Sequence, residues 1–297
     1  MRGRYAPYFF ISWERSRKLD IQWYPGHMAK ARRQLKEKLK TVDLVIEVLD
    51  ARAPASSLNP DFDDLFSHKT RFYVLNKADL ADENITKNWL CYFKNQKIRA
   101  VSFSATRGNV ELLKKQIIDC AAPLLRRYRE KGMNKTLRCA IVGIPNVGKS
   151  AILNRLSGEK KLKEGNRPGV TKALQWAKID EHLEIMDTPG LLWPKFQEER
   201  TGAVVALIGS VKLDILDEEA LAFYLIGFLK QTAPALLQNR YQLDSLDKND
   251  FGLLEDICRA RGFLLKGGVY DTERGAKTLL DEFKNGRLGR LSLEKPE

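Results

Sequence analysis

Five short runs of apolar residues mark the first two thirds of the 297-residue chain. The run at residues 42–49 is almost wholly apolar and rich in β-branched side chains, which is typical of a strand buried on both faces. Each of the four later runs ends directly before a polar or glycine-rich motif, at residues 71–75, 98–103, 137–142 and 183–186. Because open parallel sheets bind ligands at the carboxyl ends of their strands, this pattern predicts a doubly wound α/β sheet over residues 40–192.

Helical periodicity separates the predicted strands. Apolar residues recur every four positions in residues 29–39, which favours an amphipathic helix. Two further helices are predicted at residues 110–125 and 151–156. The runs at 174–179 and 183–186 are joined by a polar Asp-Glu-His turn, so we expect them to form a hairpin.

The pattern changes beyond residue 205, where strand-like runs stop. Asp217 is a helix-capping residue in front of an apolar stretch that extends to Lys230. Two more helices are predicted at 253–261 and 271–285, the second followed by a glycine that favours its end. We therefore predict three parts: a disordered extension at residues 1–20, an α/β domain at residues 21–205 and an all-helical domain at residues 206–297.

The composition is that of an ordinary globular chain, with 43% apolar residues. Its four cysteines are scattered without paired spacing, so we expect reduced thiols and a cytoplasmic location. No apolar run approaches the roughly 20 residues that cross a bilayer, and no membrane association is expected. The first twenty residues are too charged for a secretory signal; an upstream start codon and a short organellar presequence both remain open as their origin.

The net charge of +13 is unevenly distributed. Residues 1–40 hold eleven basic residues against three acidic ones, and residues 126–138 hold six against one. Solvated helix faces explain either cluster alone, but two dense clusters together favour a polyanionic partner. A large nucleic acid is the economical choice. No zinc-finger or helix-turn-helix pattern indicates DNA binding.

A loop with the spacing G-x-x-x-x-G-K-S occupies residues 143–150, between a predicted strand and a predicted helix. Backbone N–H groups of such a loop bind phosphate oxygens together with the N-terminus of the following helix. Lys149 is expected to reach the β- and γ-phosphates, and the Ser150 hydroxyl to bind Mg²⁺. The predicted phosphate-binding residues are Asn146, Val147, Gly148, Lys149, Ser150, Ala151 and Gly190.

A second motif, Asn-Lys-Ala-Asp at residues 76–79, is suited to select the base. The carboxylate of Asp79 is expected to accept two hydrogen bonds from guanine, and adenine lacks such a pair of donors. Asn76 is expected to brace this loop, and a Ser-Ala pair after the next strand to support the guanine oxygen. The residues predicted to contact or support the base are Asn76, Lys77, Asp79, Ser104 and Ala105.

The metal and the attacking water require further residues. Asp187, in the motif Asp-Thr-Pro-Gly, is expected to hold Mg²⁺ together with Ser150 and Thr171, while the N–H of Gly190 senses the γ-phosphate. Ordinary GTPases with this motif have a water-orienting glutamine directly after it. This chain has Leu191 at that position. Because an apolar side chain cannot polarise water, hydrolysis must use another group or stay slow until a partner completes the site.

The order of these motifs is unusual. An ordinary small GTPase begins with the phosphate loop and ends with the base-reading motifs, whereas here residues 76–79 precede residues 143–150. The sequence therefore predicts a circularly permuted P-loop GTPase domain whose ordinary ends are joined through the basic stretch 126–138. Permutation also opens the chain just after Gly190, so a γ-phosphate-dependent movement there would be passed directly to the helical domain.

The stretch Ile-Gln-Trp-Tyr-Pro-Gly-His-Met at residues 21–28, the permuted motif order and the run Asp-Thr-Pro-Gly-Leu-Leu-Trp-Pro at 187–194 together resemble the ribosome biogenesis GTPase A family. The resemblance implies assembly of the large (50S) ribosomal subunit, with contacts to ribosomal RNA partly through the helical domain. It also implies that His27 is the catalytic residue in place of the missing glutamine, and that Asn146 contacts an activating K⁺. Ala151 departs from the family, whose members usually have threonine there.

We expect a GTP-hydrolysing factor that binds ribosomal RNA in its GTP state, leaves on hydrolysis and is monomeric away from the ribosome. Two other functions stay open. One is a GTP-dependent RNA-binding module with incidental hydrolysis, which Leu191 favours. The other is a tRNA-modification GTPase, suggested only by Asn146. An isolated histidine is more often structural than catalytic, so the residues alone leave the role of His27 open.

Overall fold

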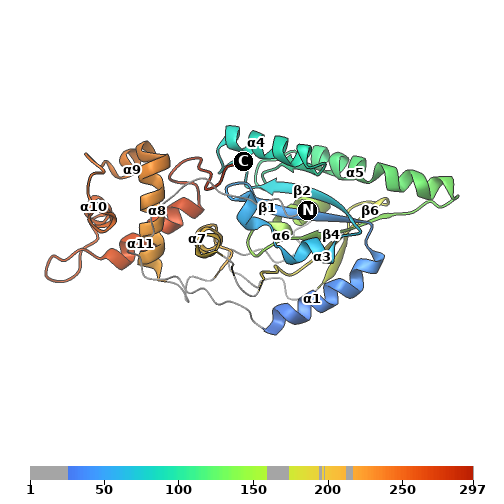
Figure 1. Ribbon diagram of the computed structural model, residues 1–297, viewed down its shortest axis with the longest axis horizontal. Helices are drawn as coiled ribbons and strands as arrows, with labels where there is room; N and C mark the ends of the chain where they lie inside the picture. Colours follow the sequence, from blue (N-terminus) through green and yellow to red (C-terminus); the bar gives the residue numbers. More distant parts are fainter. Residues whose placement is uncertain (1–25, 159–173, 194–195, 197, 212–216, 297) are drawn as a thin grey trace.

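The computed structural model describes residues 26–158, 174–193, 196, 198–211 and 217–296. These residues form an elongated molecule with a β-sheet and its helices at one end and a group of helices at the other (Figure 1). Side chains from both ends belong to one continuous buried cluster. Ala206 and Leu207 are themselves part of this cluster, so the domain boundary at 205/206 remains a prediction.

A six-stranded sheet forms the α/β end, in the strand order β3-β2-β1-β4-β6-β5. All neighbouring strands are parallel except β5 and β6, which form the predicted antiparallel hairpin. This mostly parallel sheet confirms the predicted fold class, and every expected strand is present. The strands are β1 (Leu44–Asp50), β2 (Thr70–Asn76), β3 (Arg99–Ser102), β4 (Leu137–Val142), β5 (Gln175–Lys178) and β6 (Leu183–Asp187).

Three helices follow the carboxyl ends of these strands. They are α4 (Glu83–Asn95), α5 (Val110–Glu130) and α6 (Lys149–Ser157). The carboxylate of Asp82 and the amide oxygen of Asn109 each accept the N–H three residues later, at 2.9 and 3.0 Å, and so cap α4 and α5. In Figure 1 these two helices lie along the upper side of the sheet. The sequence pattern indicated α5 and α6, but α4 was not predicted.

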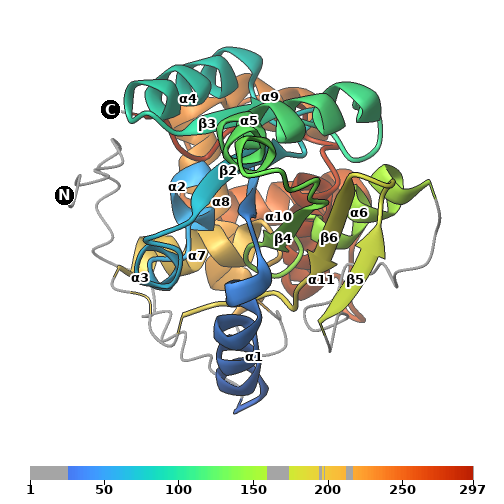
Figure 2. The same cartoon turned by 90° about the vertical axis from the view of Figure 1, so that its right-hand side faces the viewer.

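Three short or peripheral helices complete this end of the molecule: α1 (Gly26–Lys38), α2 (Pro54–Ser57) and α3 (Asp61–Leu65). Helix α1 confirms the amphipathic pattern, because Leu35 is fully buried among solvated basic residues. A turn of 3-10 helix at Leu39–Thr41 then leads into β1. Figure 2 shows α1 below the sheet, with α3 on the neighbouring side.

The C-terminal helices pack around α8. This helix contacts α7, α9, α10 and α11, and most of its residues are buried. The structure confirms the three predicted helices, which correspond to α8, α10 and α11, and adds α7 and α9. Their bounds are α7 (Glu199–Leu207), α8 (Glu218–Thr232), α9 (Pro234–Tyr241), α10 (Asp250–Arg261) and α11 (Thr272–Lys284).

Among the described residues, no single helix is both long and apolar enough to cross a membrane. Within the part of the chain that the structure describes, α8 and α9 taken together are the one pair with the required length and composition, and the chain bends by 115° between them.

The chain returns to the sheet after α11. Leu291 and Leu293 are buried, and the chain end lies beside α4 (Figure 1). The buried carboxylate of Glu294 accepts the backbone N–H groups of Ala55 and Ser56, at 2.8 and 3.1 Å, which are the first residues of α2 after its proline. This return was not predicted from the sequence.

Glu282 of α11 joins three of the C-terminal helices. Its carboxylate accepts hydrogen bonds from Arg240 at 2.7 and 2.8 Å, from Tyr241 at 2.9 Å and from Arg261 at 2.6 Å. Burial raises the pKa of Glu282, but the hydrogen bonds and the two guanidinium charges outweigh burial and lower this pKa to about 2. The ionised carboxylate therefore stabilises the folded helices.

Replacing Glu282 with glutamine should destabilise the protein by about 2 kcal/mol at pH 7, because two guanidinium groups lose their buried partner. The stabilisation from a lowered carboxyl pKa is present above the unfolded value of about 4.5 and is lost as pH falls through about 2. Urea denaturation should therefore show a gap between wild type and Glu282→Gln that closes over this range. Asp244→Asn, at an exposed position, is the control, and a gap independent of pH would contradict the assignment.

Candidate functional site

The sequence motifs meet at one edge of the sheet. Strands β2 and β6 end at Asn76 and Asp187, and β4 leads directly into the loop at residues 143–148. Strand β3 ends shortly before Ser104. Since the strands are parallel neighbours, motifs that are far apart along the chain lie together at their carboxyl ends. The motifs therefore lie at the carboxyl edge of the sheet, where the sequence pattern predicted the site.

The phosphate loop depends on two glycines in conformations that other residues rarely adopt. Gly143 has φ +150° and Gly148 has φ +96°. A Cβ at Gly143 would lie 2.5 Å from the carbonyl oxygen of Val48, and a Cβ at Gly148 would lie 2.2 Å from the side-chain nitrogen of Asn76. The loop therefore tolerates no side chain at either position.

Lys149 lies inside the loop that it terminates. Its ammonium group donates to the carbonyl oxygens of Gly143 and Ile144, at 3.2 and 2.9 Å. Burial lowers the pKa of Lys149 to about 8, although the nearby charge of Asp187 acts in the opposite direction. A phosphate entering the loop would supply the negative charge that this buried ammonium group needs.

Asn76 connects three of the motifs. Its side chain is buried, with 1% exposed. The amide nitrogen donates to the carbonyl of Val147 in the phosphate loop at 2.7 Å, and the amide oxygen accepts the N–H of Ala105 at 3.0 Å. The expected bracing role of Asn76 therefore extends beyond its own loop to the phosphate loop and the Ser-Ala pair.

Asp79 is held from the Ser-Ala side. The hydroxyl of Thr106 donates to its carboxylate at 3.3 Å and lies 2.9 Å from the hydroxyl of Ser104. Ala105 presents its N–H to Asn76, as described above. Thr106 was not predicted as a site residue, and the one signal for it in the sequence is that it directly follows the Ser-Ala pair.

Lys77 has a buried acidic partner that the motif does not reveal. Its ammonium group lies 2.9 Å from the carboxylate of Asp50, at the end of β1. Arg52 binds the same carboxylate through two hydrogen bonds of 2.8 and 2.9 Å. Burial raises the pKa of Asp50, but the charges of Arg52 and Lys77 outweigh it and hold this pKa well below its usual range. Lys77 itself adopts φ +60°, which fits a tight loop.

The expected Mg²⁺ ligands include one pair in direct contact. The hydroxyl of Ser150 donates to the carboxylate of Asp187 at 3.0 Å. These are hard oxygen donors, and Mg²⁺ in such sites takes one or two protein ligands and completes its shell with water and phosphate oxygens. The pair therefore fits the ion chemically. Thr171 lies outside the described residues.

Gly190 and Leu191, which follow Asp187 in the motif expected to sense the γ-phosphate, lie against the phosphate loop. The backbone of Gly190 lies against the phosphate loop, because a Cβ there would be 2.7 Å from the Cα of Pro145. Leu191 is 4% exposed and its N–H donates to the carbonyl of Gly143 at 3.2 Å, so its side chain belongs to the core. His27 lies in the first turn of α1, and its side chain lies outside the described residues.

Asn146 and its neighbour connect the phosphate loop to the end of α7. The side-chain nitrogen of Asn146, a residue with φ +60°, donates to the carbonyl of Gly209 at 2.6 Å. The hydroxyl of Ser210 donates to the carbonyl of Pro145, also at 2.6 Å. The phosphate loop is therefore bonded to the beginning of the helical region, a connection that the sequence did not indicate.

A phosphate loop, a guanine-selective motif and an Mg²⁺-type acid, arranged on one sheet edge in rotated chain order, define the class of circularly permuted P-loop GTPases. A family model described as a 50S ribosome-binding GTPase matches residues 138–238. That match begins at the strand before the phosphate loop and leaves out the base-reading motif, as the permuted order requires.

The chain belongs to the ribosome biogenesis GTPase A family. It is 42% identical to Ribosome biogenesis GTPase A of Bacillus cereus over 281 residues, which cover 93% of this chain and 94% of the relative. It is 36% identical to the Thermotoga maritima protein of the same name over 277 residues, covering 93% and 95%. This membership makes the chain a guanine-nucleotide-binding enzyme that hydrolyses GTP.

Solved structures agree with this assignment. The GNP-bound structure of YlqF from T. maritima superposes with a TM-score of 0.65 at 32% identity, covering 90% of this chain and 99% of that chain. A GDP-bound YlqF structure gives the same TM-score and identity, with 89% and 99% covered.

Asn76→Ala should weaken GDP binding by about tenfold to a hundredfold, because it leaves the Val147 carbonyl and the Ala105 N–H without their partner, at roughly 1 kcal/mol or more for each. Titration with a fluorescent GDP analogue measures this loss. Asn95→Ala, at an exposed site on α4, is the matched control. Wild-type affinity in the Asn76 variant would show that the cross-link is dispensable.

Proposed function

We propose that this GTPase is an assembly factor for the large (50S) ribosomal subunit, binding ribosomal RNA in its GTP state and leaving after hydrolysis. The observation that carries the proposal is the permuted guanine-nucleotide site in a chain whose relatives are named ribosome biogenesis GTPases. The description of the matching family model, a 50S ribosome-binding GTPase, supports the choice of the large subunit.

Each part of the site has a role in this proposal. Asp79 reads guanine, and Lys77, Ser104 and Ala105 support it. The loop residues Asn146, Val147, Gly148, Lys149, Ser150 and Ala151, with Gly190, bind the phosphates. Ser150 and Asp187, with Thr171, would hold Mg²⁺, which neutralises charge on the β- and γ-oxygens when bound.

We assign the catalytic position to His27, because Leu191 is buried and cannot orient water. Asn146 would contact K⁺ as an activator. A cation takes the oxygen of an amide rather than its nitrogen, so the hydrogen bond from the Asn146 nitrogen to Gly209 is compatible with this role.

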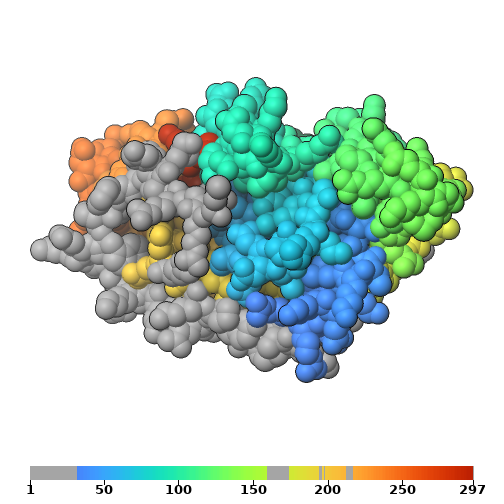
Figure 3. Space-filling model, turned by 45° about the vertical axis from the view of Figure 1, so that its right-hand side comes forward, coloured from blue at the N-terminus to red at the C-terminus, as the bar shows by residue number. Residues whose placement is uncertain are grey.

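A basic groove supports an RNA partner. It lies between α1 and α3, which sit on the same face in Figure 3, and its volume is about 550 Å³. Arg33, Lys36 and Lys40 follow one another at helical spacing along its wall, all exposed. Asp64 is the one acidic residue among the described residues that line the groove. A row of cations at this spacing fits the phosphates of an RNA strand.

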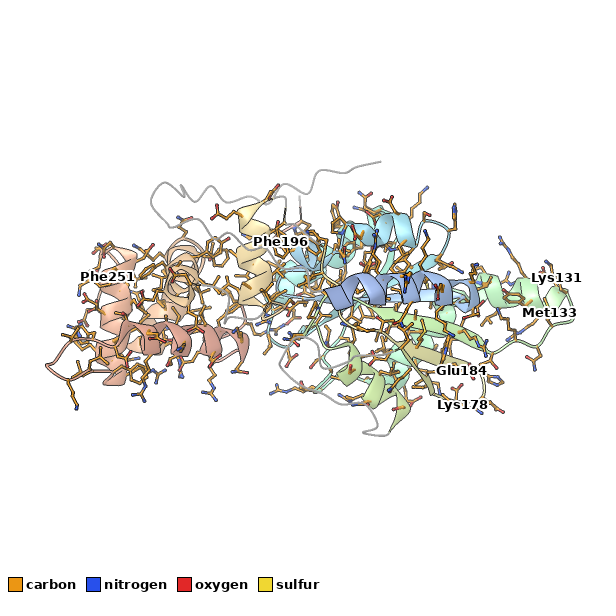
Figure 4. The ribbon with its side chains drawn as sticks, turned by 90° about the horizontal axis from the view of Figure 1, so that it is seen from below. Lys131, Met133, Lys178, Glu184, Phe196 and Phe251 are labelled. Atoms are coloured by element: carbon orange, nitrogen blue, oxygen red, sulfur yellow. The ribbon has the colours of Figure 1, made fainter. Side chains whose placement is uncertain are left out.

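The second basic cluster lies at the tip of the sheet end. The connector between α5 and β4 carries Lys131 and Met133, and Figure 4 shows both at the opposite end of the molecule from Phe251 of α10. Arg138 pairs with Glu184 at 3.1 Å, and Lys135 pairs with Asp43. These two charges are therefore partly neutralised within the protein, whereas Arg126, Arg127, Arg129 and Lys131 of the same cluster are exposed.

Purified large subunits should raise GTP turnover well above the basal rate, and His27→Ala should lower the stimulated rate by about a hundredfold or more while leaving GDP affinity unchanged. Multiple-turnover phosphate release measures both. His182→Ala, in the exposed turn between β5 and β6, is the control. Stimulation that survives in His27→Ala would favour the RNA-binding module with incidental hydrolysis.

Neutralising the groove should weaken binding to large subunits and flatten its salt dependence, by about one unit of slope for each lost phosphate contact. The variant replaces Arg33, Lys36 and Lys40 with glutamine, and sedimentation at several salt concentrations measures the slope. The matched control removes three exposed lysines elsewhere, namely Lys94, Lys97 and Lys115. Equal slopes for the two variants would remove the groove from the RNA contact.

A further inference from the structure

The segment after α11 runs along the loop that carries Asp79. The guanidinium group of Arg290 donates to two carbonyl oxygens of that loop, to Ala81 through Nε at 2.7 Å and to Ala78 through Nη2 at 3.2 Å. Ala78 directly precedes Asp79, and Ala81 follows two residues after it. One planar side chain therefore connects the backbone on both sides of the base-reading carboxylate.

Backbone and hydroxyl contacts extend this connection. The N–H of Leu291 donates to the carbonyl of Leu80 at 2.9 Å, and the N–H of Asp82 donates to the hydroxyl of Ser292 at 3.1 Å. Gly286, which ends α11 with φ +71°, comes so close to the loop that a Cβ would lie 2.6 Å from the side chain of Leu80. Successive residues of the segment thus hold successive residues of the loop.

The same segment reaches the acidic partner of Lys77. The N–H of Leu293 donates to the carbonyl of Arg52 at 2.7 Å. Arg52 in turn holds the carboxylate of Asp50, which lies 2.9 Å from the Lys77 ammonium. The guanidinium of Arg52 also donates to the last carbonyls of α11, at 3.3 Å. The base-reading loop is therefore bonded to the C-terminal helices from two sides.

We propose that the C-terminal segment 290–293 is part of the guanine site, with Arg290 as a positioning residue that fixes the loop backbone around Asp79. Two hydrogen bonds to guanine need the carboxylate in one orientation, and that orientation depends on the loop backbone that Arg290 binds at Ala78 and Ala81. This inference rests on the proposed role of Asp79. It goes beyond that role by placing part of guanine selectivity in residues more than 200 positions away in the chain.

The position of Arg290 has a specific consequence. The segment contacts the base end of the site, and the base is the same in GDP and GTP. Losing Arg290 should therefore weaken both nucleotides by the same factor, unlike a defect at the γ-phosphate. By linkage, a bound guanine nucleotide should strengthen the docking of the segment by that same factor.

The test measures the affinities of Arg290→Ala for GDP, a non-hydrolysable GTP analogue and IDP, whose base lacks the exocyclic amino group. We expect about tenfold weaker binding of both guanine nucleotides and a smaller loss for IDP, so that the GDP-to-IDP ratio falls. Arg290→Lys, which can reach one carbonyl rather than two, should lie between wild type and alanine.

Arg287→Ala removes the same charge from an exposed position nearby and is the matched control. If Arg290→Ala lowers thermal stability but leaves the GDP-to-IDP ratio at the wild-type value, the segment is only structural and the proposal is wrong. If Arg290→Ala fails to fold, Ser292→Ala replaces it, because this variant removes only the contact to Asp82. A GDP-to-IDP ratio at the wild-type value in Ser292→Ala would then contradict the proposal.

Asp79→Asn, measured in parallel, separates this proposal from the assignment of Asp79 itself. That variant should exchange guanine for xanthine nucleotides. If it does not, the role of Asp79 fails whatever the Arg290 variants show. If it does and the Arg290 ratio is unchanged, only the positioning proposal fails.

Discussion

The side-chain amide of Asn76 is the contact on which the nucleotide site depends. It is buried at the end of β2 and bonds the phosphate loop through Val147 and the Ser-Ala loop through Ala105. A buried amide that lost either partner would cost about 1–3 kcal/mol, so these three loops hold one another in place. The cross-link depends on neighbouring strand ends and not on their order along the chain. Circular permutation therefore leaves the chemistry of the site intact.

Two further connections join this site to the helical region. Asn146 and Pro145 of the phosphate loop are bonded to Gly209 and Ser210 after α7. The base-reading loop is bonded to the segment after α11. A movement after Gly190 was expected to act on the helical domain through one covalent connection. In the structure, the phosphate loop and the base-reading loop are each bonded to that region as well, so a movement of either loop would act on residues next to α7 or α11.

Much of the fold was predictable because its signals are local. The β-branched runs gave every strand, and the polar turn gave the β5–β6 hairpin. The missed helices have physical reasons. Helix α2 spans only Pro54–Ser57, α7 contains a glycine within a short run of Glu199–Leu207, and α9 begins directly at Pro234 after the bend from α8. Helix α4 did carry local signals that were overlooked, because Asp82 caps it and its buried Trp89 and Phe93 lie four residues apart.

The sequence by itself determined the nucleotide chemistry, because each motif is a short segment. The spacing of its glycines, lysine and carboxylates is set within a few residues of the chain. The sequence also determined the permuted order. Only the tertiary structure decided which residues outside the motifs support the site: the Asp50–Arg52 pair beside Lys77 and the return of Arg290 to the base-reading loop. The contacts of Lys77 with Asp50 and of Arg290 with the base-reading loop join residues that are distant in the chain. They form because buried charges and backbone groups must find partners once the core has packed, and no local pattern encodes that requirement.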